Sequence, residues 1–212
     1  MKKLLFLSLI VVMFTGCGDT SSRGSYDNTN NTSNSSSGGH KSMEGYNAIH
    51  KVPVISDSQK QNFLDAINAA RADTQDCKEH GVFDPAPALK WNDKLYKAAY
   101  EHTQDIAIHG IVEHDGTNTA SDWTAKDSKL GRGSHFYERI TANGYKNYKI
   151  IEENVAGGTY LDTPEKVVDA WIKSPGHCAN LMNKDVTEVG MALVKKNTKY
   201  THYWSQEFGT TH

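Results

Sequence analysis

Three cysteines are the residues of this 212-residue chain whose chemistry is easiest to assign from position. Cys17 follows an apolar run over residues 4–14, which two lysines precede. The run is too short for a transmembrane helix, which needs roughly 20 apolar residues, and suits the apolar region of a signal peptide. A Thr-Gly pair before Cys17 provides the small residues that lipoprotein signal peptidase requires, although Phe14 stands where leucine is usual. We therefore predict a lipoprotein signal peptide over residues 1–16 and lipidation of Cys17, with ordinary signal cleavage beside an incidental cysteine as the alternative.

Lipidation of Cys17 would fix the chain to a membrane, because each buried CH₂ contributes about 0.8 kcal/mol. Residues 17–50 are rich in Ser, Asn and Gly, and residues 28–39 contain no apolar side chain. Such a segment cannot bury enough surface to offset its ordering entropy. We expect it to be a disordered tether that carries a single domain over residues 51–212. The predicted location is the cell envelope, facing the periplasm or the cell exterior.

Cys77 and Cys178 remain once Cys17 carries lipid. Two leftover thiols in an oxidising compartment tend to pair, so we predict a disulfide between them. Two separate buried thiols are the alternative. A disulfide that closes a loop of about 100 residues would stabilise the fold by at most about 4.7 kcal/mol in the chain-entropy treatment.

Histidine, glutamate and serine side chains could carry further chemistry. His114 and His177 are far apart in the sequence, and their spacing alone does not identify them as ligands. Two neutral imidazoles and a carboxylate suit Zn²⁺ and can leave a fourth position to water. A second possibility is a nucleophile, base and acid formed by Ser174, His177 and Glu153. No nucleophile-elbow sequence surrounds Ser174, however, and its place before Pro175 favours a hydroxyl bonded to local backbone.

The elements that must position these residues are predicted from caps and apolar periodicity. Ser56 and Gln59 form a capping box at the first helix, and Thr163-Pro164 opens the last long helix. Helices are expected over residues 56–77, 92–110, 135–142 and 163–174, a short turn over 178–182, and strands over 150–156, 188–195 and 200–208. A long polar loop joins His114 to Gly133. Helices followed by a terminal hairpin indicate an α+β domain with helices packed on an antiparallel sheet.

Several short motifs occur in a fixed order between residues 58 and 209. They are Leu89-Lys90-Trp91-Asn92, His114, Glu152-Glu153-Asn154-Val155-Ala156, Val167-Val168-Asp169-Ala170-Trp171, Ser174-Pro175-Gly176-His177-Cys178-Ala179-Asn180-Leu181-Met182, Glu188-Val189-Gly190-Met191 and Tyr203-Trp204-Ser205-Gln206-Glu207-Phe208-Gly209. This order resembles the bacterial branch of the CAP superfamily of cysteine-rich secretory proteins, antigen 5 and pathogenesis-related 1 proteins, also called the SCP domain. The resemblance implies a three-layer α-β-α sandwich with an antiparallel sheet.

The resemblance also implies a cleft with two histidines and acidic residues that can bind a divalent metal. His114 and His177 match the two histidines, and Glu153 matches the acid of the family's Gly-Glu-Asn motif. These three residues are the predicted ligands of Zn²⁺ or another divalent cation. Glu153 could instead accept a hydrogen bond from one imidazole and orient it. Two positions depart from the family pattern: Glu152 replaces the usual glycine, and Ser174 stands where eukaryotic members have a second acid.

The predicted function is a membrane-anchored, non-enzymatic binding module. Its partners would be the membrane, through the N-terminal lipid, and an unidentified lipid or protein ligand of the cleft. The chain has a net charge of −2 and no basic stripe, which argues against nucleic acid. The alternative is a metal-assisted or serine hydrolase acting on peptide, lipid or cell-wall material, and the missing second acid and activated nucleophile argue against it. A third possibility is a structural envelope protein. The Cys77 and Cys178 pair also resembles one bacterial subgroup, which supports the disulfide.

Two further side chains have alternative interpretations. His102 is expected on the inner face of the second helix, where a hydrogen-bonded core histidine is the simpler role. Trp123 falls in the long polar loop, where it could contact a lipid or partner or could pack locally.

Overall fold

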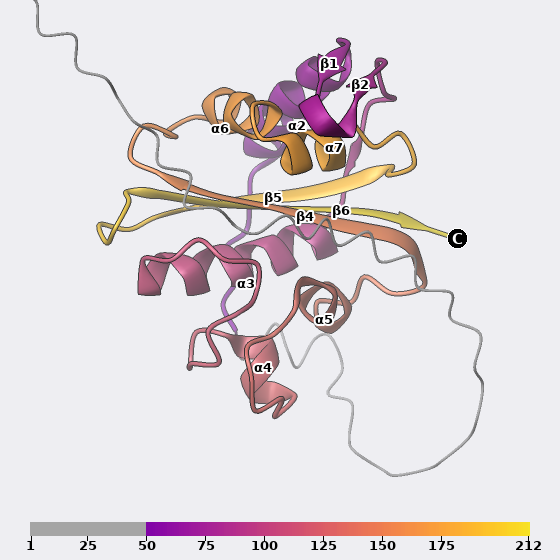
Figure 1. Cartoon of the computed structure of the whole chain (residues 1–212). Coiled ribbons are helices and arrows are strands. Elements are labelled where there is room, and N and C mark those ends of the chain that lie inside the picture. Colours follow the sequence, from indigo (N-terminus) through magenta and orange to yellow (C-terminus); the bar gives the residue numbers. More distant parts are fainter. Residues whose placement is uncertain (1–49) are drawn as a thin grey trace, which may run out of the picture.

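The computed structural model describes residues 50–212. The predicted signal peptide, Cys17 and all but the last residue of the predicted tether lie outside these residues. Two layers of helices enclose a central sheet (Figure 1). The α+β class and the three-layer sandwich are therefore confirmed. Within residues 50–212, no helix combines the length and the apolar character needed to cross a membrane.

The central sheet has the strand order β3-β5-β6-β4. Its long strands are β4 (Tyr148–Gly158), β5 (Glu188–Lys195) and β6 (His202–Thr211). These three pair antiparallel, as predicted, while the short β3 (Lys90–Trp91) pairs parallel to β5 and makes the sheet mixed. A separate hairpin of β1 (Gln75–Asp76) and β2 (Val82–Phe83) was not predicted. Strands of two residues are too short for an alternating apolar pattern to reveal them.

One layer consists of α2 (Asp57–Arg71), α6 (Pro164–Ile172) and α7 (Pro175–Met182). The capping box of Ser56 and Gln59 forms at α2 as predicted. Thr163 caps α6, with proline in its first turn. Only a turn was expected at α7, but Pro175 starts it three residues earlier, because a proline at the first helical position gives up no hydrogen bond. This layer packs on the sheet through a core that includes Trp171 and Trp204.

The opposite layer consists of α3 (Asp93–His109), α4 (Trp123–Asp127) and α5 (Phe136–Ala142). Asn92 caps α3, and Gly110 ends it with φ 67°. Such a left-handed angle is easily adopted only by glycine. Helix α4 was not predicted, and it lies within the segment expected to be a polar loop. Asp122 caps α4 and also accepts hydrogen bonds from the backbone and hydroxyl of Ser134, which ties the start of α4 to the end of this segment.

Gly190 sets how closely α3 approaches the sheet. A Cβ atom at this position of β5 would lie 1.9 Å from the backbone nitrogen of Tyr96. Only glycine therefore allows the first turns of α3 to rest against β5. This contact holds α3 against the sheet, and so helps to position the loop after α3, which carries His114.

Candidate functional site

His114 and His177 come together from opposite layers of the sandwich. His114 lies in the loop after α3, and His177 lies in the first turn of α7. Their ring centroids are 6.3 Å apart, and the ring planes are inclined by 41°. Glu153 lies between the two layers on β4, the strand at one edge of the sheet. The structure thus brings the three predicted site residues together at the β4 edge of the sheet.

Glu153 is held by two side chains at once. Its Oε1 accepts a hydrogen bond from His114 Nδ1 at 2.8 Å, and its Oε2 accepts one from Arg139 Nη2 at 2.7 Å. The Glu153 residue is only 4% exposed. A buried carboxylate is tolerated only when it is paired and hydrogen-bonded. Both of its oxygens are therefore committed to protein groups.

Arg139 is a site residue that sequence reasoning missed. It lies on α5, is 1% exposed, and also donates from Nη2 to the backbone oxygen of His114 and from Nη1 to that of Ser134. The guanidinium therefore fixes the His114 loop as well as Glu153. One signal could have revealed it. The helical spacing of a buried face places Arg139 with Phe136 and Ile140. An arginine on a buried face needs a buried partner for its charge.

His177 is positioned by a separate set of contacts. Its Nδ1 lies 2.9 Å from Ser174 Oγ, and its backbone oxygen accepts a hydrogen bond from Asn154 Nδ2. Asn180 donates to both Asn154 and the backbone oxygen of Glu153. The Glu153 side chain binds His114, so no acid orients His177 in the way that a Ser-His-acid relay requires.

The two imidazoles have opposite electrostatic environments. Burial lowers the pKa of His114, but the hydrogen bond and charge of Glu153 outweigh it, and the pKa is raised overall. Burial, reinforced by the positive charge of His114, lowers the pKa of His177 to about 4. At neutral pH, His177 is therefore an uncharged ring.

Two more buried groups surround Glu153. Glu207 is its partner across the β4–β6 pairing, and burial together with the Glu153 charge raises the pKa of Glu207 well above its ordinary value. Burial and the charge of Arg139 lower the pKa of His102 to about 4. Burial raises the pKa of Glu153. The charge of Arg139 and the interactions with His102 and His114 outweigh this effect, so the pKa of Glu153 is lowered overall. At neutral pH, Glu153 is thus ionised and His102 is neutral. His102 is fully buried and bound to the Glu113 backbone oxygen, as expected for a core histidine.

The neighbours of Glu153 on β4 face the other layer. Glu152, which stands where the family has glycine, is buried and accepts a hydrogen bond from Asn183 just after α7. Arg71 on α2 is fully buried nearby and interacts electrostatically with Glu152. The glutamate therefore fits without a local turn, because β4 continues through this position as regular strand.

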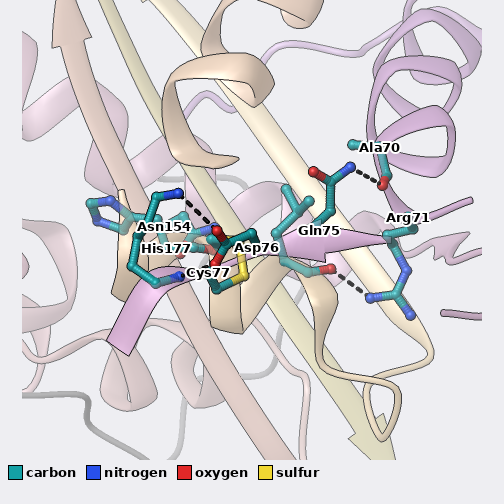
Figure 2. The surroundings of a disulfide bond; sticks show 10 residues. Ala70, Arg71, Gln75, Asp76, Cys77, Asn154 and His177 are labelled. Carbon is teal, nitrogen blue, oxygen red and sulfur yellow. Dashed lines mark hydrogen bonds and ion pairs between the residues drawn. A yellow bond between two sulfur atoms is a disulfide. The ribbon is translucent and has the colours of Figure 1, made fainter. Parts of the chain in front are cut away.

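A disulfide joins Cys77 to Cys178, as predicted, with Cα atoms 5.5 Å apart. Cys178 directly follows His177, so the bond ties the start of α7 to the segment between β1 and β2. Figure 2 shows Asn154, His177, Cys77 and Asp76 gathered around it. The disulfide thus helps to fix the position of His177.

The two imidazoles are the groups of this site that could donate to a divalent metal. Across residues 50–212, the Nε2 atoms of His114 and His177 have no hydrogen-bond partner, while both Nδ1 atoms are engaged. Histidines that bind metal commonly direct their other nitrogen to a carboxylate, as His114 does. No group of three His, Cys, Asp or Glu residues in the described part of the chain could hold an ion together. The geometry therefore suits Glu153 as the carboxylate that orients His114 better than as a direct ligand.

Trp123, whose role was left open, packs locally. It is 8% exposed and stacks on His50, with ring centroids 4.6 Å apart and an interplanar angle of 7°. His50 also pairs with Asp127 at the other end of α4. These contacts attach the first described residues of the chain to α4.

Residues 64–208 match the model of the cysteine-rich secretory protein family, CAP. The chain belongs to this family. The chain is 28% identical over 120 residues to the uncharacterized protein YkwD of Bacillus subtilis, a match that covers 57% of this chain and 38% of YkwD. It spans less than two fifths of the length of the curated relatives it matches.

Solved structures agree with this CAP fold. An outer surface protein from Borrelia burgdorferi has a TM-score of 0.53 and 19% identity, and the match covers 75% of this chain and 97% of that protein. An extracellular protein with an SCP domain from Bacillus anthracis has a TM-score of 0.52 and 19% identity, with 76% and 45% covered. These likenesses support the fold of the CAP domain described above.

Proposed function

We propose that this CAP-domain protein is a lipid-anchored, extracytoplasmic binding module whose cleft holds a divalent metal through His114 and His177. The similar proteins from Borrelia burgdorferi and Bacillus anthracis are described as outer-surface and extracellular, which supports the location. The predicted signal peptide and Cys17 support the anchor. The cleft would present the metal to a lipid or protein ligand outside the cytoplasm.

The observation that carries this proposal is the arrangement of the two imidazoles. Each ring has one nitrogen fixed by the protein, His114 by Glu153 and His177 by Ser174, and one nitrogen without a partner within residues 50–212. Zn²⁺ usually takes four ligands in proteins. Two protein ligands would leave the remaining positions to water or to an oxygen of the bound partner, which the ion would attract by its charge.

A hydrolase remains the second candidate, and two features of the site weigh against it. Both oxygens of Glu153 are engaged, so this carboxylate is not free to act as general base. Ser174 and His177 lie within hydrogen-bond distance, but Glu153 binds the other histidine. A binding role needs neither group.

Zinc titration calorimetry on the full chain in detergent tests the metal site. We expect one Zn²⁺ per chain at pH 7.5, and loss of this binding in His114→Ala and in His177→Ala. Because the pKa of His114 is raised above 6.5, its ring is mostly protonated at pH 5.5, and binding should weaken at least about tenfold. His202→Ala is the matched control, since His202 binds the Thr159 backbone oxygen away from the cleft.

Equal, weak zinc uptake by the wild type and both cleft variants would rule out the metal site. The anchor has its own test, which is mass spectrometry of the N-terminal peptide from cells. We expect the mass of a diacylglyceryl group on Cys17, and its absence in Cys17→Ser. An unmodified N-terminal cysteine would contradict the anchor without affecting the conclusion about the cleft.

A further inference from the structure

A concave surface lies away from His114 and His177. It is a groove of about 310 Å³ that residues from both helical layers line, since α2 and α3 lie on opposite faces of the sheet. The segment Pro53–Ile55, Pro164, Leu193 on β5 and Trp204 on β6 complete the lining. Ligand pockets in proteins start at about 300 Å³ and are lined mainly by apolar and aromatic side chains. The histidine cleft lies at the β4 edge of the sheet, whereas this groove reaches Leu193 on β5. A ligand of the groove would therefore be independent of the metal proposed above.

The groove is lined by aromatic rings that hold one another in place. Phe63 on α2 packs edge-on against Trp204, with centroids 6.0 Å apart. Tyr96 and Tyr100 on α3 are 6.3 Å apart by ring centroids. The Tyr96 hydroxyl donates to the Pro53 backbone oxygen and so attaches the rim segment. Because these contacts exist without a ligand, the lining is preformed.

Charge restricts what the groove can bind. None of its lining residues carries a charge. A phosphate or carboxylate would find no cation there and would lose its hydration without compensation. The ligand class that fits is therefore neutral.

Two polar groups at the groove are available for hydrogen bonds. Within the described chain, neither the exposed Asn62 amide nor the half-buried Tyr100 hydroxyl has a hydrogen-bond partner. A hydrocarbon chain laid over them would bury polar atoms without partners, which costs free energy. A ring with apolar C–H faces and hydroxyls at its edge satisfies both the aromatic lining and these two groups.

We propose that this groove binds a neutral glycan, with a sugar ring against the aromatic lining and its hydroxyls bonded to Asn62 and Tyr100. Val54, which is 98% exposed at the rim, extends the apolar surface toward the next sugar unit. The juxtaposition of uncharged aromatic faces with an unpartnered amide and hydroxyl carries this assignment.

Calorimetric titration of the full chain with chitotetraose and cellotetraose, two neutral oligosaccharides, tests the proposal. The chain should be kept in a detergent that has no sugar headgroup. We expect saturable binding of at least one tetraose. Tyr100→Ala should weaken it by about tenfold through loss of the ring face. Tyr100→Phe and Asn62→Ala, which remove only hydrogen bonds, should weaken it by about three- to tenfold.

Two controls separate the groove from the rest of the molecule. Tyr160→Ala removes a tyrosine that is 75% exposed outside the groove, and His114→Ala alters only the histidine cleft. Both should bind the tetraose like the wild type. The proposal is overturned if neither tetraose binds at concentrations up to about 10 mM, or if Tyr100→Ala and Asn62→Ala bind as tightly as the wild type. Binding of palmitate that Tyr100→Ala abolishes, without binding of either tetraose, would also overturn it and assign the groove to an acyl chain.

Discussion

Arg139→Met should be among the most damaging single substitutions in this domain. The guanidinium is 1% exposed and binds Glu153, the His114 backbone and the Ser134 backbone. Methionine would leave the Glu153 charge buried without its one permanently charged partner among the described residues, beside His114, His102 and Glu207. Removing one member of a buried ion pair costs about 3–5 kcal/mol. Since domains are stable by only about 5–15 kcal/mol, this loss is a large fraction of the total.

Urea unfolding followed by circular dichroism measures this effect. With a slope of about 2 kcal/mol per molar urea, the midpoint should fall by about 2 M. Arg132→Met is the matched control. Arg132 makes a bidentate pair with Glu138, but its side chain is 45% exposed, and an exposed pair contributes at most about 1 kcal/mol. If the two arginine variants lose equal stability, or if Arg139→Met loses less than about 1 kcal/mol, the reasoning is wrong.

A double substitution tests the cause of the loss. Glu153→Gln removes the charge that Arg139→Met leaves without its main partner. We therefore expect the double variant to be more stable than Arg139→Met alone, because the penalty arises from an uncompensated charge and not from lost packing. A double variant whose loss is simply the sum of the two single losses would show that the pair is not coupled.

Three further predictions concern the frame of the cleft. Replacing Cys77 and Cys178 together by alanine should lower the free energy of unfolding by at most about 4.7 kcal/mol, and an unchanged urea midpoint would contradict this. Gly190→Ala should lower the melting temperature more than ordinary overpacking of about 1–3 kcal/mol would, because its Cβ would lie 1.9 Å from the Tyr96 backbone nitrogen; a melting temperature equal to that of the wild type would contradict this contact. The pKa of His102 is lowered to about 4 in the folded state, so below its unfolded value of about 6.5 the unfolded chain binds the proton more readily. His102 should then account for a loss of stability of up to about 3 kcal/mol between pH 6.5 and 4. Because the pKa of His177 is also lowered to about 4, His102→Gln should reduce this slope in urea melts across that range without removing it.

Helix boundaries could be predicted where local sequence decides them. Caps and end signals act through hydrogen bonds or backbone angles within one turn of the chain. All of those predicted appear in the structure: the capping box of Ser56 and Gln59, the caps Asn92 and Thr163, and the helix end at Gly110. Helix α4 could not be predicted this way. It is a helix of only 5 residues. Its stability comes from the hydrogen bonds between Asp122 and Ser134 and from the stacking of Trp123 on His50. Contacts between distant residues leave no periodic pattern in a short segment.

The site was predictable only in part, because its members come from three layers. His114, Glu153 and His177 were assigned through the family resemblance, since neither spacing nor periodicity connects them. Arg139 and Glu207 were missed. Neither was assigned a role from the sequence: Arg139 lies in the helix predicted over residues 135–142, and Glu207 lies in the strand predicted over residues 200–208. Their roles depend on burial beside Glu153, which only the packed structure provides.

The polar run Glu152-Glu153-Asn154 is the strongest argument that the cleft has a function beyond the fold. These three residues are buried within a strand, where apolar side chains would be the less costly choice. Each reaches a different part of the cleft frame: Glu152 binds Asn183 after α7, Glu153 binds His114, and Asn154 binds the His177 backbone. The strand therefore holds two histidines from opposite layers in one fixed relation. The proposed binding role accounts for this arrangement, because a binding site needs the two imidazoles fixed before the ligand arrives.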